Sequence, residues 1–279
     1  MWINNWMNFW KSKLNLVTLY PKHIILMGYK YNINASYFKN IDTEYKAYIL
    51  GFIYADGSVY QPPGNRQLNF RIGVQERDSY ILDQLSLAAA GGHKHTVKTP
   101  SSIKKGYQPQ VCVNISSNEL CQDLINFGCG VRKSKEGMKF PQLSPEMVSH
   151  FIRGFLDGDG SVILKKQSYK YKRKTSYSIS NPHQDRFKLV LAFSSTDKEF
   201  LLEIAKHLQV EKPYITEKVR TIMNYILWIE VKADVQKAIM YLYGDCNYFL
   251  QRKYNKVIEF NKTIKSEATD TSVERLETT

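Results

Sequence analysis

The chain has 279 residues, of which 39 are Lys or Arg and 26 are Asp or Glu, so its formal net charge is +13 at pH 7. Hydrophobic residues make up 43% and charged residues 23%, which is typical of a globular protein and excludes a disordered one. The longest apolar runs, such as residues 49–55, fall far short of the roughly 20 residues that cross a bilayer. The excess of cations attracts polyanions, with nucleic acid the first candidate and an anionic membrane surface the second.

Residues 1–42 precede any repeated pattern, and we expect them to form an N-terminal extension. Within them Trp2, Trp6 and Trp10 follow helical spacing, which is more often a packing face than a ligand site. The first 20 residues contain no Arg and no basic lead into an apolar run, so we expect neither a secretory nor a transit peptide.

An internal repeat follows the extension. The stretches GFIYADGSV at 51–59 and GFLDGDGSV at 154–162 share six of nine letters in the same order. The segments that follow correspond as well: 68–85 and 187–208 each alternate like a strand and then take helical spacing. A second strand and an amphipathic helix ending at glycine come next in each copy, at 108–128 and 224–244. The chain is therefore predicted to be a duplication.

Each half reads as helix, two strands, helix, two strands, helix, and each closes on a basic cluster. This order predicts an α+β fold with two pseudo-symmetric αββαββα halves, each containing a four-stranded antiparallel sheet. We place the first half at residues 43–140, the second at 141–262 and a polar, disordered tail at 263–279.

The first helix of each half is apolar on nearly all sides, so both are expected to be buried. Small residues lie four apart in each helix, at Gly51 and Ala55 and at Gly154 and Gly158, which lets two backbones approach closely. Crossing about a pseudo-twofold would bring the acids that end these helices together. Two carboxylates at helix C-termini repel each other unless a cation lies between them, and Mg²⁺ suits such oxygen ligands. One Asp-Gly after a helix is usually an ordinary turn, but two on paired helices favour a site.

These residues resemble the LAGLIDADG homing endonucleases, with ILGFIYADG at 49–57 and IRGFLDGDG at 152–160 as the two motif copies. The resemblance covers residues 43–260 and implies the single-chain, monomeric form, which recognises long, largely non-palindromic duplex DNA. It implies that Asp56 and Asp159, at the eighth motif position, bind the metal. The carbonyls of Ala55 and Gly158 are implied as further ligands. At the sixth position the first copy has Tyr54 instead of an acid, and the second has Asp157.

The resemblance implies metal-dependent cleavage of both DNA strands, with Mg²⁺ or another divalent cation such as Mn²⁺ as the cofactor. A divalent ion stabilises charge on a phosphoryl oxygen and acidifies an attacking water. Lys133 and Lys253 are implied as transition-state stabilisers because each follows the last helix of its half. Gln75 matches a polar active-site position of the family, and its counterpart in the second half is expected at Ser194.

The sheets are expected to present one solvent-facing side as a DNA-binding saddle. Alternation assigns Leu68, Phe70, Ile72 and Val74 to the core, and polar residues between them to the DNA side. A second set of cations is expected in the long hairpin of the second half, interleaved with tyrosines. The predicted DNA contacts, which alternatively are merely solvated, are Gln67, Asn69, Arg71, Lys165, Lys166, Lys170, Lys172, Arg173 and Lys174.

Other functions remain open at this stage. An intron maturase that binds RNA, or a non-catalytic DNA-binding regulator, could use the same scaffold, although retention of both motif acids weighs against the regulator. A small-molecule phosphate enzyme would need a Gly-rich loop or a His cluster, which the sequence lacks. The four cysteines form no C-x-x-C pair and have no His at zinc-ligand spacing, which predicts reduced thiols and a reducing compartment such as a bacterial cytoplasm or an organelle matrix.

Overall fold

The computed structural model describes residues 32–97, 108–131, 137–167, 186–219 and 223–276, the last 13 of them as helix backbone only. The chain divides into two units, residues 1–32 and 33–279, and the helices and strands that the structure describes all belong to the second unit. Within those described ranges, no helix combines the length and the apolar character needed to cross a membrane.

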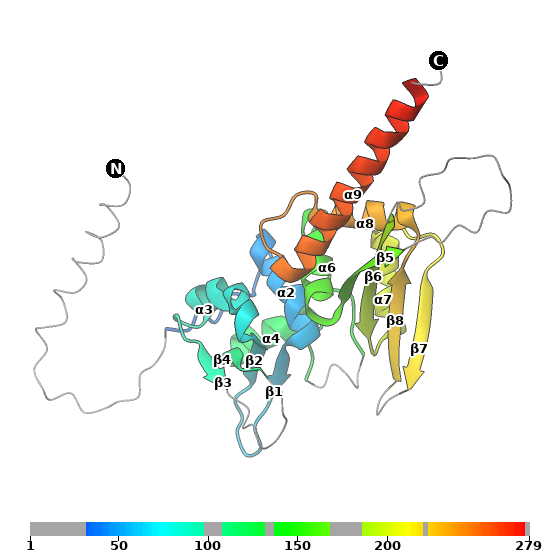
Figure 1. The fold of residues 1–279 in the computed structure, drawn as a ribbon. Coiled ribbons are helices and arrows are strands. Elements are labelled where there is room, and N and C mark those ends of the chain that lie inside the picture. Colours follow the sequence, from blue (N-terminus) through cyan, green and yellow to red (C-terminus); the bar gives the residue numbers. More distant parts are fainter. Residues whose placement is uncertain (1–31, 98–107, 132–136, 168–185, 220–222, 277–279) are drawn as a thin grey trace, which may run out of the picture. The chain divides into compact units, whose positions relative to one another are not determined.

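The first half has the predicted order of elements (Figure 1). Its four strands form an antiparallel sheet in the order β1-β2-β4-β3. The second helical position is split into a 3-10 turn and a short α-helix. The elements are α2 (Glu44–Asp56), β1 (Ser58–Tyr60), β2 (Asn69–Gln75), η1 (Glu76–Leu82), α3 (Asp83–Ala89), β3 (His95–Val97), β4 (Gln110–Ser116) and α4 (Asn118–Asn126).

The second half repeats this arrangement with the strand order β5-β6-β8-β7, so the predicted α+β architecture with two four-stranded antiparallel sheets is confirmed. It ends with one helix more than the first half shows. The elements are α6 (Pro145–Asp159), β5 (Ser161–Gln167), β6 (Arg186–Ser195), α7 (Lys198–His207), β7 (Tyr214–Val219), β8 (Met223–Ile229), α8 (Lys232–Tyr243) and α9 (Gln251–Leu276).

The ends of the second unit differ from the sequence expectation. Helix α9 continues to Leu276, so the prediction of a disordered tail over residues 263–279 does not hold for residues 263–276. The Lys, Glu and Ala residues of this segment are good helix formers. At the other end, Tyr37 and Phe38 from the predicted extension are buried in the core.

The core lies between the helices and one face of each sheet. Strand β2 alternates as predicted: Phe70, Ile72 and Val74 are buried, whereas Arg71 and Gln75 are exposed. Because successive side chains of a strand point to opposite faces, this pattern gives the first sheet one apolar and one polar side.

Helices α2 and α6 lie side by side between the two sheets, and their backbones touch (Figure 1). A Cβ at Gly51 would collide with the carbonyl oxygen of Phe151, and a Cβ at Gly154 would collide with that of Tyr48. Only glycine fits at these two positions, because a backbone oxygen of the partner helix occupies the space of a side chain. The predicted close approach at the motif glycines is confirmed.

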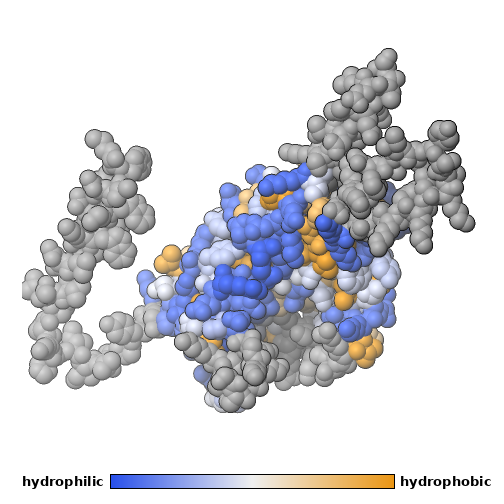
Figure 2. Space-filling view, viewed as in Figure 1, coloured by the Kyte–Doolittle hydropathy of each residue, from blue (hydrophilic) through white to orange (hydrophobic). Residues whose placement is uncertain are grey.

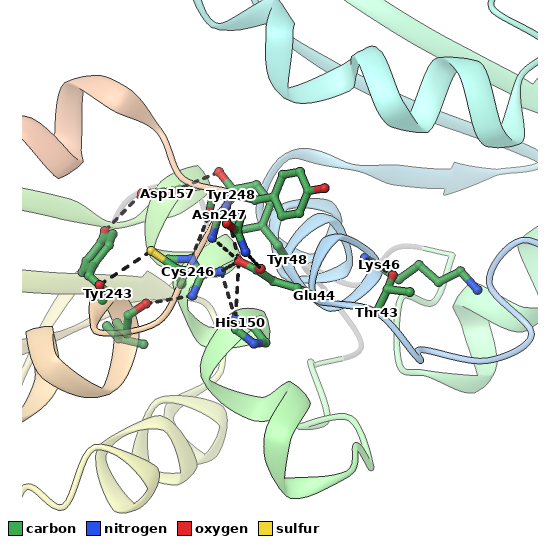
Figure 3. A network of polar contacts seen from close by, with 12 residues as sticks. Thr43, Glu44, Lys46, Tyr48, His150, Asp157, Tyr243, Cys246, Asn247 and Tyr248 are labelled. Carbon is green, nitrogen blue, oxygen red and sulfur yellow. Dashed lines mark hydrogen bonds and ion pairs between the residues drawn. The ribbon is translucent and has the colours of Figure 1, made fainter.

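Glu44, at the beginning of α2, lies beside Asn247 and Tyr248 of the loop before α9 (Figure 3). A buried arginine of α6 joins these two segments. The fully buried guanidinium of Arg153 donates to Glu44 Oε1 at 2.8 Å and to the carbonyls of Tyr248 and Leu242 at 2.7 Å each. Glu44 also accepts from the backbone N–H of Asn247 at 2.6 Å and from its side chain at 2.8 Å. Burial alone would raise the pKa of Glu44, but the hydrogen bonds from Asn247 and Tyr248 and the Arg153 charge hold it below its ordinary value.

Replacing Gly154 by Leu is expected to destabilise the fold by about 1 to 3 kcal/mol or more, because the added carbons overpack the α2–α6 contact. Denaturant unfolding followed by circular dichroism measures the change. Ala233→Leu, at an exposed position of α8, is the control and should change the free energy of unfolding by less than about 0.5 kcal/mol. Equal stability of the Gly154 variant and the parent would contradict the tight seam.

Replacing Arg153 by Met is expected to cost about 3 to 5 kcal/mol, since it leaves the half-buried Glu44 carboxylate without its cation. The same unfolding measurement applies. Lys206→Met, at an exposed position of α7, removes a cation from the surface and should have almost no effect. A loss no larger than that of the Lys206 variant would show that the buried contacts of Arg153 contribute nothing net.

Candidate active site

The two motif helices end in the same way. Asp56 is the last residue of α2 and Asp159 the last of α6, and both side chains are exposed. The glycine that follows closes each helix, with Gly57 N–H donating to the Ile53 carbonyl at 2.9 Å and Gly160 N–H to the Leu156 carbonyl at 3.0 Å. Both acids are therefore held at helix C-termini, where the backbone already presents partial negative charge.

The two helix ends also touch each other. A Cβ at Gly158 would overlap the Ala55 side chain and would lie 3.5 Å from Asp56 Oδ2. The carboxylate of the first motif thus borders the backbone of the second, one residue before Asp159. The structure brings together the four positions predicted as metal ligands, Asp56, Asp159, Ala55 and Gly158.

Lys253, in the first turn of α9, lies beneath this junction. Its side chain is 4% exposed, and its ammonium donates to the carbonyls of Leu156 at 2.7 Å, Asp157 at 2.6 Å and Gly160 at 2.7 Å. Burial lowers the pKa of Lys253 to about 8, while the negative charges of Asp157, Asp56 and Asp159 act in the opposite direction. The sequence predicted that Lys253 belongs to the site, but not that it lies under the end of α6.

Asp157, the sixth residue of the second motif, is buried beside Lys253, and Figure 3 shows it near Tyr243. Its Oδ2 accepts from the Leu250 N–H at 2.7 Å and from the Tyr48 hydroxyl at 3.0 Å, and its Oδ1 accepts from the Tyr243 hydroxyl at 3.4 Å. Burial raises the pKa of Asp157 to about 6, against the Lys253 charge and these hydrogen bonds, which favour the ionised form.

Tyr54 takes the same motif position in the first half. It is buried, and its hydroxyl lies within hydrogen-bonding reach of the carbonyl oxygens of Phe127 and Lys139. These two residues flank residues 128–138, a range that includes Lys133. Lys133 itself lies outside the described residues. The first motif thus has, in place of an acid, a tyrosine whose hydroxyl contacts backbone carbonyls.

Gln75 is exposed at the end of β2, opposite Gln110 of β4. The strand pairing revises its expected counterpart. Ser58 pairs with Arg71 and the equivalent Ser161 pairs with Ala192, which places the counterpart of Gln75 at Thr196 instead of Ser194. Sequence alternation alone does not detect a shift of two residues, because it leaves every side chain on the same face.

The first sheet carries a polar row on its exposed side. Arg71 lies opposite Asn114, and Asn69 lies opposite Ser116. Gln67, just before β2, is exposed and donates from Nε2 to the Ser116 carbonyl at 3.1 Å. The predicted first-half DNA contacts therefore share one surface.

The cations predicted in the second half are only partly described. Lys165 and Lys166 are both exposed in β5, but as neighbours in a strand they point to opposite faces. Lys165 lies opposite Lys188, which forms an ion pair with Glu230 at 2.6 Å. Lys170, Lys172, Arg173 and Lys174 lie outside the described residues.

The donor set limits what metal could bind. Within the ranges the structure describes, no three His, Cys, Asp or Glu side chains are grouped to hold an ion. A cation at the helix ends would therefore use the two carboxylates together with backbone, water or substrate oxygens. None of the four cysteines, all of which lie within the described residues, forms a disulfide.

Sequence reasoning missed the role of Arg153 and of Tyr48. A lone Arg inside an otherwise apolar motif helix was a usable signal, because a buried cation needs an anionic or carbonyl partner. The identity of that partner was not predictable, since Glu44 lies 109 residues away.

No protein-family model matches the sequence, and no curated protein matches it. Solved structures do match. The LAGLIDADG homing endonuclease I-LtrWI bound to target DNA is 12% identical over 80% of this chain and 91% of its own, with a TM-score of 0.52.

Two further structures agree. I-SmaMI bound to cleaved DNA is 15% identical, covers 83% of this chain and 92% of its own, and has a TM-score of 0.51. The LAGLIDADG meganuclease I-CpaMI bound to uncleaved DNA is 14% identical, with 85% and 96% covered and a TM-score of 0.51. With its two motif helices crossing between two four-stranded sheets, the chain has the fold of the single-chain LAGLIDADG homing endonucleases.

Proposed function

We propose that this protein is a site-specific endonuclease that makes a metal-dependent double-strand break in a long, mostly non-palindromic DNA duplex. The observation that carries the proposal is the junction of the two motif helices, where Asp56 and Asp159 end adjoining helices above one buried cation, Lys253. Proteins with this fold have been solved on target DNA and on cleaved DNA. The two halves in one chain favour a monomer with internal symmetry.

The residues at the junction fit a divalent cation. Two exposed carboxylates at the negative ends of two helices repel each other, and an ion between them would relieve that repulsion. Lys253 uses its three donors on the carbonyls of Leu156, Asp157 and Gly160, so it has none for the Gly158 carbonyl. Asp56 and Asp159, with the carbonyls of Ala55 and Gly158, are the proposed ligands of Mg²⁺ or Mn²⁺.

When bound, the ion would stabilise charge on a phosphoryl oxygen and lower the pKa of a water molecule. The chain itself supplies position and charge. The α2–α6 seam fixes the two carboxylates beside each other, so that one acid serves each DNA strand. Gln75, exposed at the end of β2, is proposed to orient a water or phosphate by hydrogen bonding. Lys133 is proposed to stabilise the transition state in the first half.

The polar side of the first sheet is proposed to contact DNA. Gln67, Asn69 and Arg71 offer the amide and guanidinium groups that read base edges. On the second sheet, Lys165 offers charge for phosphates, whereas its neighbour Lys166 points to the opposite face of β5. The described surface drawn in Figure 2 is largely hydrophilic, with hydrophobic side chains in small separate areas, which suits a polar partner. The cations at 170, 172, 173 and 174 are proposed to extend this contact.

Asp56→Asn and Asp159→Asn are each expected to abolish or cripple double-strand cutting while leaving DNA affinity within about threefold, because the amide cannot replace a charged metal ligand. Cutting is measured in Mg²⁺ on a duplex selected by sequencing the cut ends of a randomised library. Asp83→Asn, an exposed aspartate of α3, is the control and should cut normally. Full cleavage by the Asp56/Asp159 double variant would overturn the assignment.

Replacing both Arg71 and Lys165 by Ala is expected to weaken DNA binding and flatten its salt dependence. Each lost phosphate contact should lower the slope of log affinity against log salt by about 0.9. Fluorescence anisotropy at several salt concentrations measures the slope, and Lys206→Ala on α7 should leave it unchanged. A parental slope in the double variant would show that this side of the sheets does not bind phosphate.

A further inference from the structure

Helix α6 and the start of α9 hold each other through two buried side chains, Asp157 and Lys253, which we name the α6–α9 clamp. From α6, the Asp157 carboxylate accepts the N–H of Leu250, the residue before α9. From the first turn of α9, the Lys253 ammonium donates to three carbonyls at the end of α6. Each helix end is therefore fixed by a side chain of the other.

The clamp is built with its polar atoms satisfied. Asp157 is 1% exposed and receives two tyrosine hydroxyls besides the Leu250 N–H, one from Tyr48 of α2 and one from Tyr243 of α8. A buried charge is costly without a partner and full hydrogen bonding, so each member of the clamp depends on the other. Tyr48 also ties the clamp to the opposite motif helix.

Lys253 acts on the end of α6 rather than on a phosphate in this geometry. An ammonium has three donors, and three carbonyls take them all. Its charge offsets the negative end of the α6 dipole, where Asp159 adds a further negative charge. A shift of Lys253 would therefore move or destabilise the end of the helix that carries Asp159.

In the first half an uncharged residue, Tyr54, takes the same motif position as Asp157. Tyr54 reaches the carbonyls of Phe127 and Lys139 and so ties the chain that follows α4 to α2. Asp157 accepts a backbone N–H, whereas Tyr54 donates its O–H. Each nevertheless binds the chain segment that follows the last helix packed on the sheet of its own half, which is α8 for Asp157 and α4 for Tyr54. Both side chains are 1% exposed, which excludes direct contact with substrate.

We propose that Asp157 and Tyr54 are positioning residues, each fixing the end of its own motif helix and thereby the acid that serves one DNA strand. This inference rests on the proposed function. It predicts that substituting Asp157 or Tyr54 slows the cutting of one DNA strand more than that of the other. A residue that only stabilises the shared core would slow both strands alike.

The test uses the full-length chain with Asp157→Ala, Asp157→Asn and Tyr54→Phe, and single-turnover cutting of a duplex labelled on both strands, in Mg²⁺. Tyr45→Phe is the matched control on α2, because the buried Tyr45 hydroxyl also makes two backbone hydrogen bonds, to the Ile81 carbonyl and from the Leu85 N–H. Unfolding curves and DNA affinity are measured for every variant.

Asp157→Ala should slow one strand about tenfold to a hundredfold more than the other, the effect expected of a displacement near 1 Å at a reacting group. Tyr54→Phe should bias cutting toward the opposite strand. Asp157→Asn, whose amide oxygen can still accept the Leu250 N–H, should show a smaller bias, and it supplies a folded variant for the test if Asp157→Ala fails to fold. Tyr45→Phe should lower stability without bias. Equal slowing of both strands by the Asp157 and Tyr54 variants would overturn the proposal.

A second readout needs no cleavage. In the parent, the Leu250 amide should exchange slowly with solvent and the Lys253 ammonium should give a resolved nuclear magnetic resonance signal, as a buried, fully bonded group does. Both signatures should be lost in Asp157→Ala and weakened in Asp157→Asn. Unchanged signatures would show that the clamp does not hold Lys253. A parent protein that cuts no duplex refutes the proposed function, and these signals still decide on the clamp.

Discussion

The close approach of the α2 and α6 backbones is the constraint on which the rest of the structure depends. At Gly51 and Gly154 a carbonyl oxygen of the partner helix occupies the space of a side chain. Both helices end five residues further on, so the same contact that joins the halves also brings Asp56 and Asp159 to one place. The seam and the candidate site are consequences of one packing arrangement, and neither can change without the other.

This packing concentrates negative charge, and two buried cations, Lys253 and Arg153, lie close to the negative groups. Two helix C-termini and two acids meet at one end of the seam, where Lys253 lies beneath them. Near the beginning of α2, Arg153 binds Glu44 and two carbonyls. Each cation is nearly or fully buried and has hydrogen-bonding partners for its charge, which is the condition under which a buried ion pair is tolerated. Arg153 fastens the chain between α8 and α9 to α6, and Lys253 fastens the first turn of α9 to the end of α6.

The repeated, local features of this fold were predictable from sequence. Alternation in β2 and the small residues of the motif helices report short-range constraints, and the structure has both as expected. The burial of Lys253 was not predictable, because its carbonyl partners lie more than 90 residues away and backbone atoms leave no trace in the sequence. The strand register was not predictable either, because a shift of two residues leaves every apolar and polar side chain on the same face.

The two halves share one backbone arrangement but differ in the side chains that it carries. Tyr54 and Asp157 fill one motif position with a hydroxyl and a carboxylate. On the outer side of the sheets, Asn69 and Arg71 correspond through strand pairing to Val190 and Ala192, which are both buried. If this side of the sheets binds DNA as proposed, one half presents Asn and Arg to base edges where the other has buried apolar residues, so the two halves cannot read the same sequence. Under the proposed function, the asymmetry of the target would follow from the asymmetry of these two sheets.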